Sequence, residues 1–92
     1  MNKANILGEF LGTFAFIFVI LTSGGNAYVV GGALILIILL LQRMSGGHVN
    51  PAVSLGMYFS GSVNFGTMIS YIAVQLSAAF LAVKVYNFFY GQ

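Results

Sequence analysis

The sequence has 92 residues, of which 60% are hydrophobic and only 4% are charged. A soluble domain carries roughly 25% charged residues, so this composition excludes a soluble protein and predicts an integral membrane protein. The cations Lys3, Arg43 and Lys84 are too few and too scattered to follow a phosphate backbone, which excludes nucleic acid as a partner. The chain contains no cysteine, so disulfide and thiolate chemistry are excluded as well.

Three segments are predicted to span the membrane. The first covers residues 5–22 and is rich in Phe, Ile and Leu. Lys3 before it and the small residues 23–27 after it are also typical of a cleaved secretory signal, but Glu9 inside the apolar stretch argues against that alternative. The second span covers residues 27–43 and ends in Arg43. The third covers residues 65–90, where Lys84 can reach the interface beside a group of aromatic side chains.

Between the second and third spans lies the stretch SGGHVNPAVSLG, residues 45–56. Asn50 is a preferred helix N-cap and Pro51 suits the first helical position, so a helix is predicted over residues 51–59. This helix would be about 14 Å long, close to half of a ~30 Å hydrocarbon core. Non-helical backbone at membrane depth is tolerated only where protein buries it or where it lines a watery cavity. The stretch therefore predicts a re-entrant half helix at a pore or binding cavity.

The polar groups of this stretch suit the passage of water or a hydroxylated solute. Asn50 supplies N–H donors at the positive end of the half helix, either by capping it or by pointing its amide into a lumen. The backbone carbonyls of Gly46, Gly47, His48 and Val49 need partners that apolar neighbours cannot supply. His48 has no second histidine, no cysteine and no carboxylate cluster around it, so we expect a structural role for it, with no metal, cofactor or catalytic site.

Charge and glycine placement add two weaker predictions. Lys3 and Arg43 fall on one side of the membrane and Lys84 on the other, a small imbalance that would allow insertion in both orientations. Gly8 and Gly12 form a small-xxx-small pair, which favours close helix packing in lipid.

The segment from Ser45 to Ser54, SGGHVNPAVS, resembles the first Asn-Pro-Ala loop of the aquaporin and glycerol-facilitator family. Glu9-Phe-Leu-Gly-Thr-Phe in the first span and Tyr71-Ile-Ala-Val-Gln75 in the third are similar to that family's first half. The resemblance implies one all-α membrane domain over residues 1–92, with three spans and a half helix. It also implies that Glu9 and Gln75 brace the loop. A proton relay is the alternative role for Glu9.

The resemblance further implies a passive channel for water or small neutral solutes such as glycerol, in the cell membrane, and not an enzyme. Family members hold two inverted halves in one chain, and this sequence resembles one half. The expected completion is an inverted second copy, forming a homodimeric pore in contact with lipid. Whether four such pores assemble stays open. The alternatives are a non-conducting structural or lysis-type membrane protein, and pairing with a different half.

The resemblance also places the lining of such a pore. The central lining would come from Asn50, Pro51 and Ala52 together with residues 46–49 of the loop. Counting back from Asn50 places Val30 at the outer constriction, where the partner copy would contribute Ile38, Gly47 and Val53. Val53 stands where the family's second loop carries an arginine.

Overall fold

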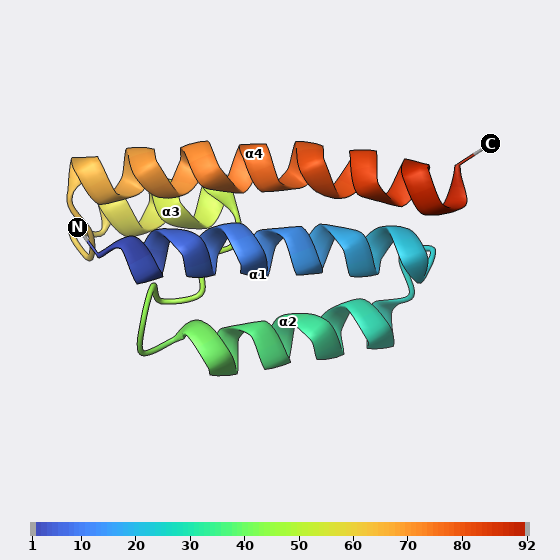
Figure 1. Cartoon of the computed structure of the whole chain (residues 1–92). Coiled ribbons are helices and arrows are strands. Elements are labelled where there is room, and N and C mark those ends of the chain that lie inside the picture. Colours follow the sequence, from blue (N-terminus) through green and yellow to red (C-terminus); the bar gives the residue numbers. More distant parts are fainter. Residues whose placement is uncertain (1, 92) are drawn as a thin grey trace.

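The computed structural model describes residues 2–91, and this part of the chain forms four helices and no strand (Figure 1). Helix α1 covers Lys3–Thr22, α2 covers Ala27–Leu41, α3 covers Pro51–Phe59 and α4 covers Phe65–Tyr90. The predicted all-α fold is confirmed. Helices α1 and α4 are long and apolar enough to cross a membrane, whereas α2 has 15 residues and ends two residues before the predicted end of the second span.

Each helix begins at an asparagine. The side-chain oxygen of this residue accepts a hydrogen bond from a backbone N–H in the first turn, which satisfies a donor that the helix itself leaves unpaired. Asn50 was predicted to act in this way, and the same cap recurs at the other three helix starts. The four bonds run from Ala4 N to Asn2 at 2.7 Å, Tyr28 N to Asn26 at 3.0 Å, Ala52 N to Asn50 at 2.8 Å, and Thr67 N to Asn64 at 2.8 Å.

The four helices lie along one axis (Figure 1). Helices α1 and α4 run side by side in the same direction, and α2 and α3 run in the opposite direction. After α2 the chain turns back to the middle of the bundle, where α3 starts, and α3 then returns to the end at which α1 begins. Helix α1 packs against α2 and α4, and α3 packs against α4. The segment 42–59 is therefore re-entrant with respect to the bundle.

The distribution of side chains is inverted relative to a soluble protein. Among the described residues, the buried set includes the polar side chains of Glu9, Thr13, Ser54 and Gln75, each at most 3% exposed. Many large apolar side chains face outward on every helix, and Phe88 is 81% exposed. A polar interior with an apolar exterior suits a protein surrounded by lipid, where water does not drive apolar groups inward.

Gly8 and Gly12 act within the chain by making room for the end of α2 and for the loop. A Cβ atom at Gly12 would lie 2.8 Å from Leu41 Cδ1 and 2.9 Å from Val49 Cγ1. At Gly8 it would lie 3.0 Å from Leu41 Cδ2. The small-xxx-small pair therefore lets the Leu41 side chain approach the backbone of α1.

We expect Gly12→Ala to lower the free energy of unfolding by about 1–3 kcal/mol, because the added methyl group overlaps Leu41 and the rigid Val49 side chain. The matched control is Gly32→Ala in α2, where no atom lies within 4 Å of the added carbon. That control should be neutral or stabilising by about 0.5–1 kcal/mol, as is usual for glycine replaced within a helix. Denaturant titration in detergent micelles, followed by helicity, measures both variants. Equal stability changes for the two would contradict this packing role.

Candidate functional site

The loop that enters α3 adopts an unusual backbone conformation. Gly46 and Gly47 have φ values of 96° and 67°, in the left-handed region that favours glycine. A Cβ atom at Gly47 would also lie 3.3 Å from the Cα atom of Ile38, so glycine lets the loop approach α2. Val49 has a φ of 44°, which is rare for a β-branched residue and costs about 1–3 kcal/mol. Surrounding interactions must hold the loop in this conformation.

The Glu9 carboxylate, which is fully buried in α1, holds the loop. Its Oε1 atom accepts a hydrogen bond from the backbone N–H of Val49 at 2.7 Å, and its Oε2 atom accepts one from that of His48 at 3.0 Å. Oε2 also accepts from the Ser45 hydroxyl at 2.6 Å, and Oε1 accepts from Gln75 Nε2 at 3.0 Å. Each of the two oxygens thus accepts two hydrogen bonds, so the buried side chain of Glu9 has its polar atoms satisfied.

Gln75 joins the carboxylate to the half helix. Its Nε2 atom donates to Glu9 and also to the Ser54 hydroxyl of α3, at 2.9 Å. Ser54 Oγ lies 2.8 Å from His48 Nδ1. Ser54 accepts from Gln75, and in its contact with Nδ1 either atom can supply the proton, depending on the His48 tautomer. Glu9, Gln75, Ser54 and His48 thus form one connected network between α1, α4, α3 and the loop.

Tyr71 supports the same loop from α4, one helical turn before Gln75. Its hydroxyl donates to the backbone carbonyl of Ser45 at 2.9 Å, and its ring meets that of His48 edge-on with centroids 5.1 Å apart. Sequence reasoning gave no individual role to Ser45, Ser54 or Tyr71. The i, i+4 spacing of Tyr71 and Gln75 on one helix face was the available signal.

Asn50 stands at the positive end of α3, near the middle of the bundle, and is exposed. Its Oδ1 atom caps the helix through Ala52 N, and its Nδ2 group has no hydrogen-bond partner within residues 2–91. The capping role expected for this side chain is thus observed, and the expectation that its amide points into a lumen stays a prediction. In the same part of the chain, the carbonyls of residues 46–49 accept no hydrogen bond.

A cavity of about 190 Å³ lies beside Asn50. Most of the predicted pore residues line it, and the full lining consists of Phe16, Leu34, Ile38, Gly47, His48, Val49, Asn50 and Val53. Gly46, Pro51, Ala52 and Val30 are not among these residues, although Val30 lies one helical turn from Leu34 on the same side of α2. Over the described residues α2 packs against α1 but not against α3 or α4, so this chain does not close the cavity between α2 and α3.

Comparisons with known proteins agree with this geometry. A family model described as Major intrinsic protein matches residues 1–92. Aquaporin NIP3-1 of Arabidopsis thaliana is 33% identical over 93 residues, covering 87% of this chain and 29% of that protein. Probable aquaporin PIP-type 7a of Pisum sativum is 26% identical over 102 residues, covering 94% of this chain and 35% of that protein.

The chain thus spans about a third of the length of the curated relatives it matches. No solved structure matches it significantly. The family match extends over the whole sequence, and the re-entrant loop with its Asn-capped half helix lies inside it. The chain therefore belongs to the major intrinsic protein family of membrane channels.

Proposed function

We propose that this chain forms a passive channel for water and small neutral solutes such as glycerol. The observation that carries the proposal is Asn50, which has a free amide group at the positive end of a half helix and borders a cavity. A single-file molecule could accept a hydrogen bond from Nδ2 and donate to the carbonyls of the loop. The positive helix end disfavours cations, and the cavity lining contains no acidic side chain that would attract them.

Proteoliposome swelling tests the function. Vesicles containing the protein should shrink faster than empty vesicles after an osmotic step, and should re-swell when glycerol is the external solute. The rival function is a non-conducting structural or lysis-type membrane protein. Shrinkage and re-swelling at the rates of empty vesicles, with protein shown to be inserted, would favour that rival.

We infer that the pore is completed by a second copy of the chain, inverted in the membrane. The support is the cavity beside Asn50, which lies between α2 and α3 and is left open because these two helices do not pack against each other. In this arrangement the two α3 helices meet at their Asn50 ends near the midplane. The competing partner is a different half that carries an arginine after its Asn-Pro-Ala. A larger assembly of several such two-chain pores would leave the inverted pair itself unchanged.

Inverted pairing requires that the chain insert in both orientations. Because the native sequence has no cysteine, one cysteine added at either terminus is a unique label site. We expect an impermeant thiol reagent, applied to intact cells, to label about half of the molecules in each case. This expectation rests on the small excess of Lys3 and Arg43 over Lys84 at the two ends of the bundle. Labelling at one terminus alone would rule out the inverted homodimer.

Val53 is the proposed constriction residue, because it lines the cavity with Ile38 and Gly47 and is 37% exposed. We expect Val53→Arg to slow glycerol flux roughly tenfold, which corresponds to about 1.4 kcal/mol in the barrier. Water, being smaller, should be slowed less. Val53→Met is the matched control, because it adds length without charge or hydrogen-bond donors. Unchanged glycerol flux in correctly assembled Val53→Arg protein would show that Val53 does not line the constriction.

A further inference from the structure

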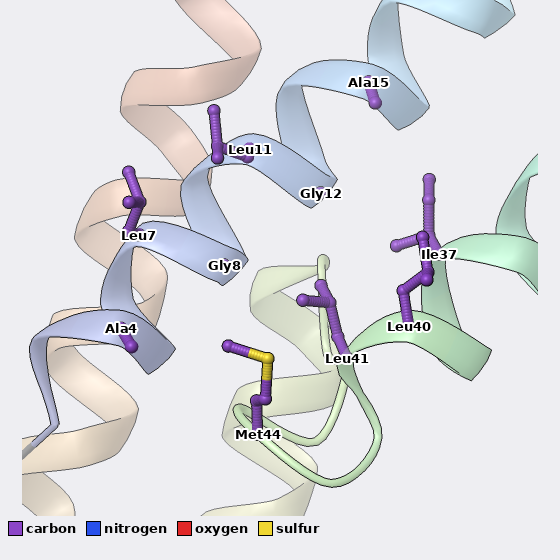
Figure 2. Close-up of a pocket in the computed structure, with 10 residues that line it drawn as sticks. All are labelled: Ala4, Leu7, Gly8, Leu11, Gly12, Ala15, Ile37, Leu40, Leu41 and Met44. Atoms are coloured by element: carbon purple, nitrogen blue, oxygen red, sulfur yellow. The ribbon is translucent and has the colours of Figure 1, made fainter.

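A second cavity lies outside the loop site, between α1 and α2 (Figure 2). It has a volume of about 380 Å³ and an entirely apolar lining, to which Leu11, Leu40 and Leu41 contribute. Ala4 and Met44 lie at one end and Ala15 at the other (Figure 2). On α2, Leu40 faces away from the side occupied by Leu34 and Ile38, and Met44 lies in the turn after the helix. The groove therefore opens on a different face of the helix pair from the loop cavity.

A third cavity, of about 350 Å³, lies on another side of α1 against α4. It is lined by Ile6, Phe10 and Val74 together with Lys3, and Leu7 borders both this cavity and the first. Two apolar grooves thus flank α1: the groove against α2 extends over its first three turns, and the groove against α4 over its first two. From Ala4 to Ala15 the helix rises about 16 Å, close to the ~15 Å thickness of one leaflet of the hydrocarbon core.

Two cations stand at the end of the molecule where these grooves begin. Lys3 precedes Ala4 and Arg43 precedes Met44, and both cations are exposed. The only acidic residue of the sequence, Glu9, is buried and bound to four donors. Neither cation therefore has an acidic side-chain partner within residues 2–91.

We propose that this end of the chain binds a phospholipid with an anionic headgroup. The phosphate would lie by Lys3 and Arg43, and the acyl chains would lie in the grooves on the two sides of α1. Both grooves are apolar, which fits acyl chains, and the groove against α2 has about the depth of one leaflet. The two cations supply the complementary charge. The site depends on membrane insertion and not on conduction, so it stands or falls independently of the channel proposal.

A second copy of the chain is a poorer occupant of the groove between α1 and α2. In the inverted pair, the partner would bring its Lys84 end to this end of the membrane. That would add a third cation where a counter-charge is needed. Lys84 itself lies over the Phe80 ring, with Nζ 5.3 Å from the centroid, and lines neither groove. It is therefore a matched control for the other two cations.

The test uses tryptophan, which the native sequence lacks. Leu11→Trp places a fluorophore in the groove, where Leu11 is 55% exposed. Leu76→Trp is the control, because Leu76 is 58% exposed and lies outside the three cavities described. It lies at a similar depth in the bundle, because its neighbour Gln75 contacts Glu9, two residues before Leu11. Both proteins are reconstituted into phosphatidylcholine vesicles that contain a minor fraction of phosphatidylglycerol. Two sets of vesicles are compared: in one the phosphatidylglycerol carries brominated acyl chains, and in the other the phosphatidylcholine does. Bromine atoms near the tryptophan quench its fluorescence.

We expect brominated phosphatidylglycerol to quench the fluorescence of Leu11→Trp more strongly than its mole fraction in the vesicle predicts. It should quench the fluorescence of Leu76→Trp only in proportion to that mole fraction. Each basic residue near an anionic surface contributes roughly fivefold to binding. Lys3→Gln and Arg43→Gln should each reduce the lipid preference by about that factor, and Lys84→Gln should leave it unchanged.

Three results would overturn the proposal. Proportional quenching of Leu11→Trp by both lipids would mean ordinary lipid contact. An equal effect of Lys84→Gln would mean attraction by net charge alone. Protection of Leu11→Trp from both lipids would mean that protein, such as a second copy, covers the groove.

Discussion

Glu9→Gln is expected to destabilise the loop before α3 and to abolish conduction. Glutamine has nearly the same size, but it replaces one carboxylate oxygen with an amide group that faces donors. Each Glu9 oxygen accepts two hydrogen bonds, so two buried donors lose their acceptor. An unsatisfied buried donor costs about 1–3 kcal/mol, which gives a loss of about 2–6 kcal/mol in the free energy of unfolding. With the amide at the Oε1 position, Val49 loses the contact that holds it at positive φ; with the amide at the Oε2 position, the neighbouring His48 N–H loses its acceptor.

Two measurements check this expectation. Denaturant titration reports global stability, and hydrogen exchange of the backbone amides in residues 45–50 reports the loop itself. The control is Ser77→Ala, which removes an exposed hydroxyl bonded to the Ala73 carbonyl in α4 and should change both readings little. Wild-type exchange at His48 and Val49 in the Glu9→Gln protein would show that the carboxylate does not hold the loop.

Local sequence signals predicted the elements of this fold well, because each depends on a few neighbouring residues. Asn50 followed by Pro51 determines where α3 begins, and the helix covers the residues expected from it. Composition identified the long apolar helices in the same way. The second span was predicted to reach Arg43, but α2 ends at Leu41 and the chain then turns, with Met44 N bonded to the Leu41 carbonyl. The predicted span included the polar pair Gln42-Arg43, whereas the helix stops at Leu41, the last residue of the apolar run.

Contacts between distant residues were less accessible to sequence reasoning. Ser45 meets Glu9 across 36 positions and Ser54 meets Gln75 across 21. Nothing in the local pattern distinguishes these two serines from exposed ones such as Ser77. The positive φ of Val49 opposes its intrinsic preference and exists only because distant groups stabilise it. Val30, placed at the constriction by counting along the sequence, does not line the cavity of one chain, and its role in a two-chain pore stays a prediction.

Asn50→Asp separates the two roles proposed for Asn50, which are capping α3 and donating a hydrogen bond to a permeating molecule. We expect this variant to lower water and glycerol flux at least roughly tenfold while α3 remains intact. Aspartate caps a helix as well as asparagine does, because its oxygen can still accept from Ala52 N. It lacks the Nδ2 donor, and it places a negative charge where neutral molecules would pass. A lost hydrogen bond of about 1.4 kcal/mol in the barrier accounts for a tenfold change. Stopped-flow light scattering of proteoliposomes measures the two fluxes.

Asn50→Ala removes both the cap and the donor, so it should lose flux to a similar extent and about 0.5–2 kcal/mol of stability in addition. The matched control is Asn64→Ala, which removes the equivalent cap from α4 and is remote from the cavity. This control should show a similar stability loss with normal flux, which separates helix capping from conduction. If correctly assembled Asn50→Asp and Asn50→Ala proteins both conduct at the wild-type rate, the free amide of Asn50 takes no part in permeation, and the pore must lie elsewhere.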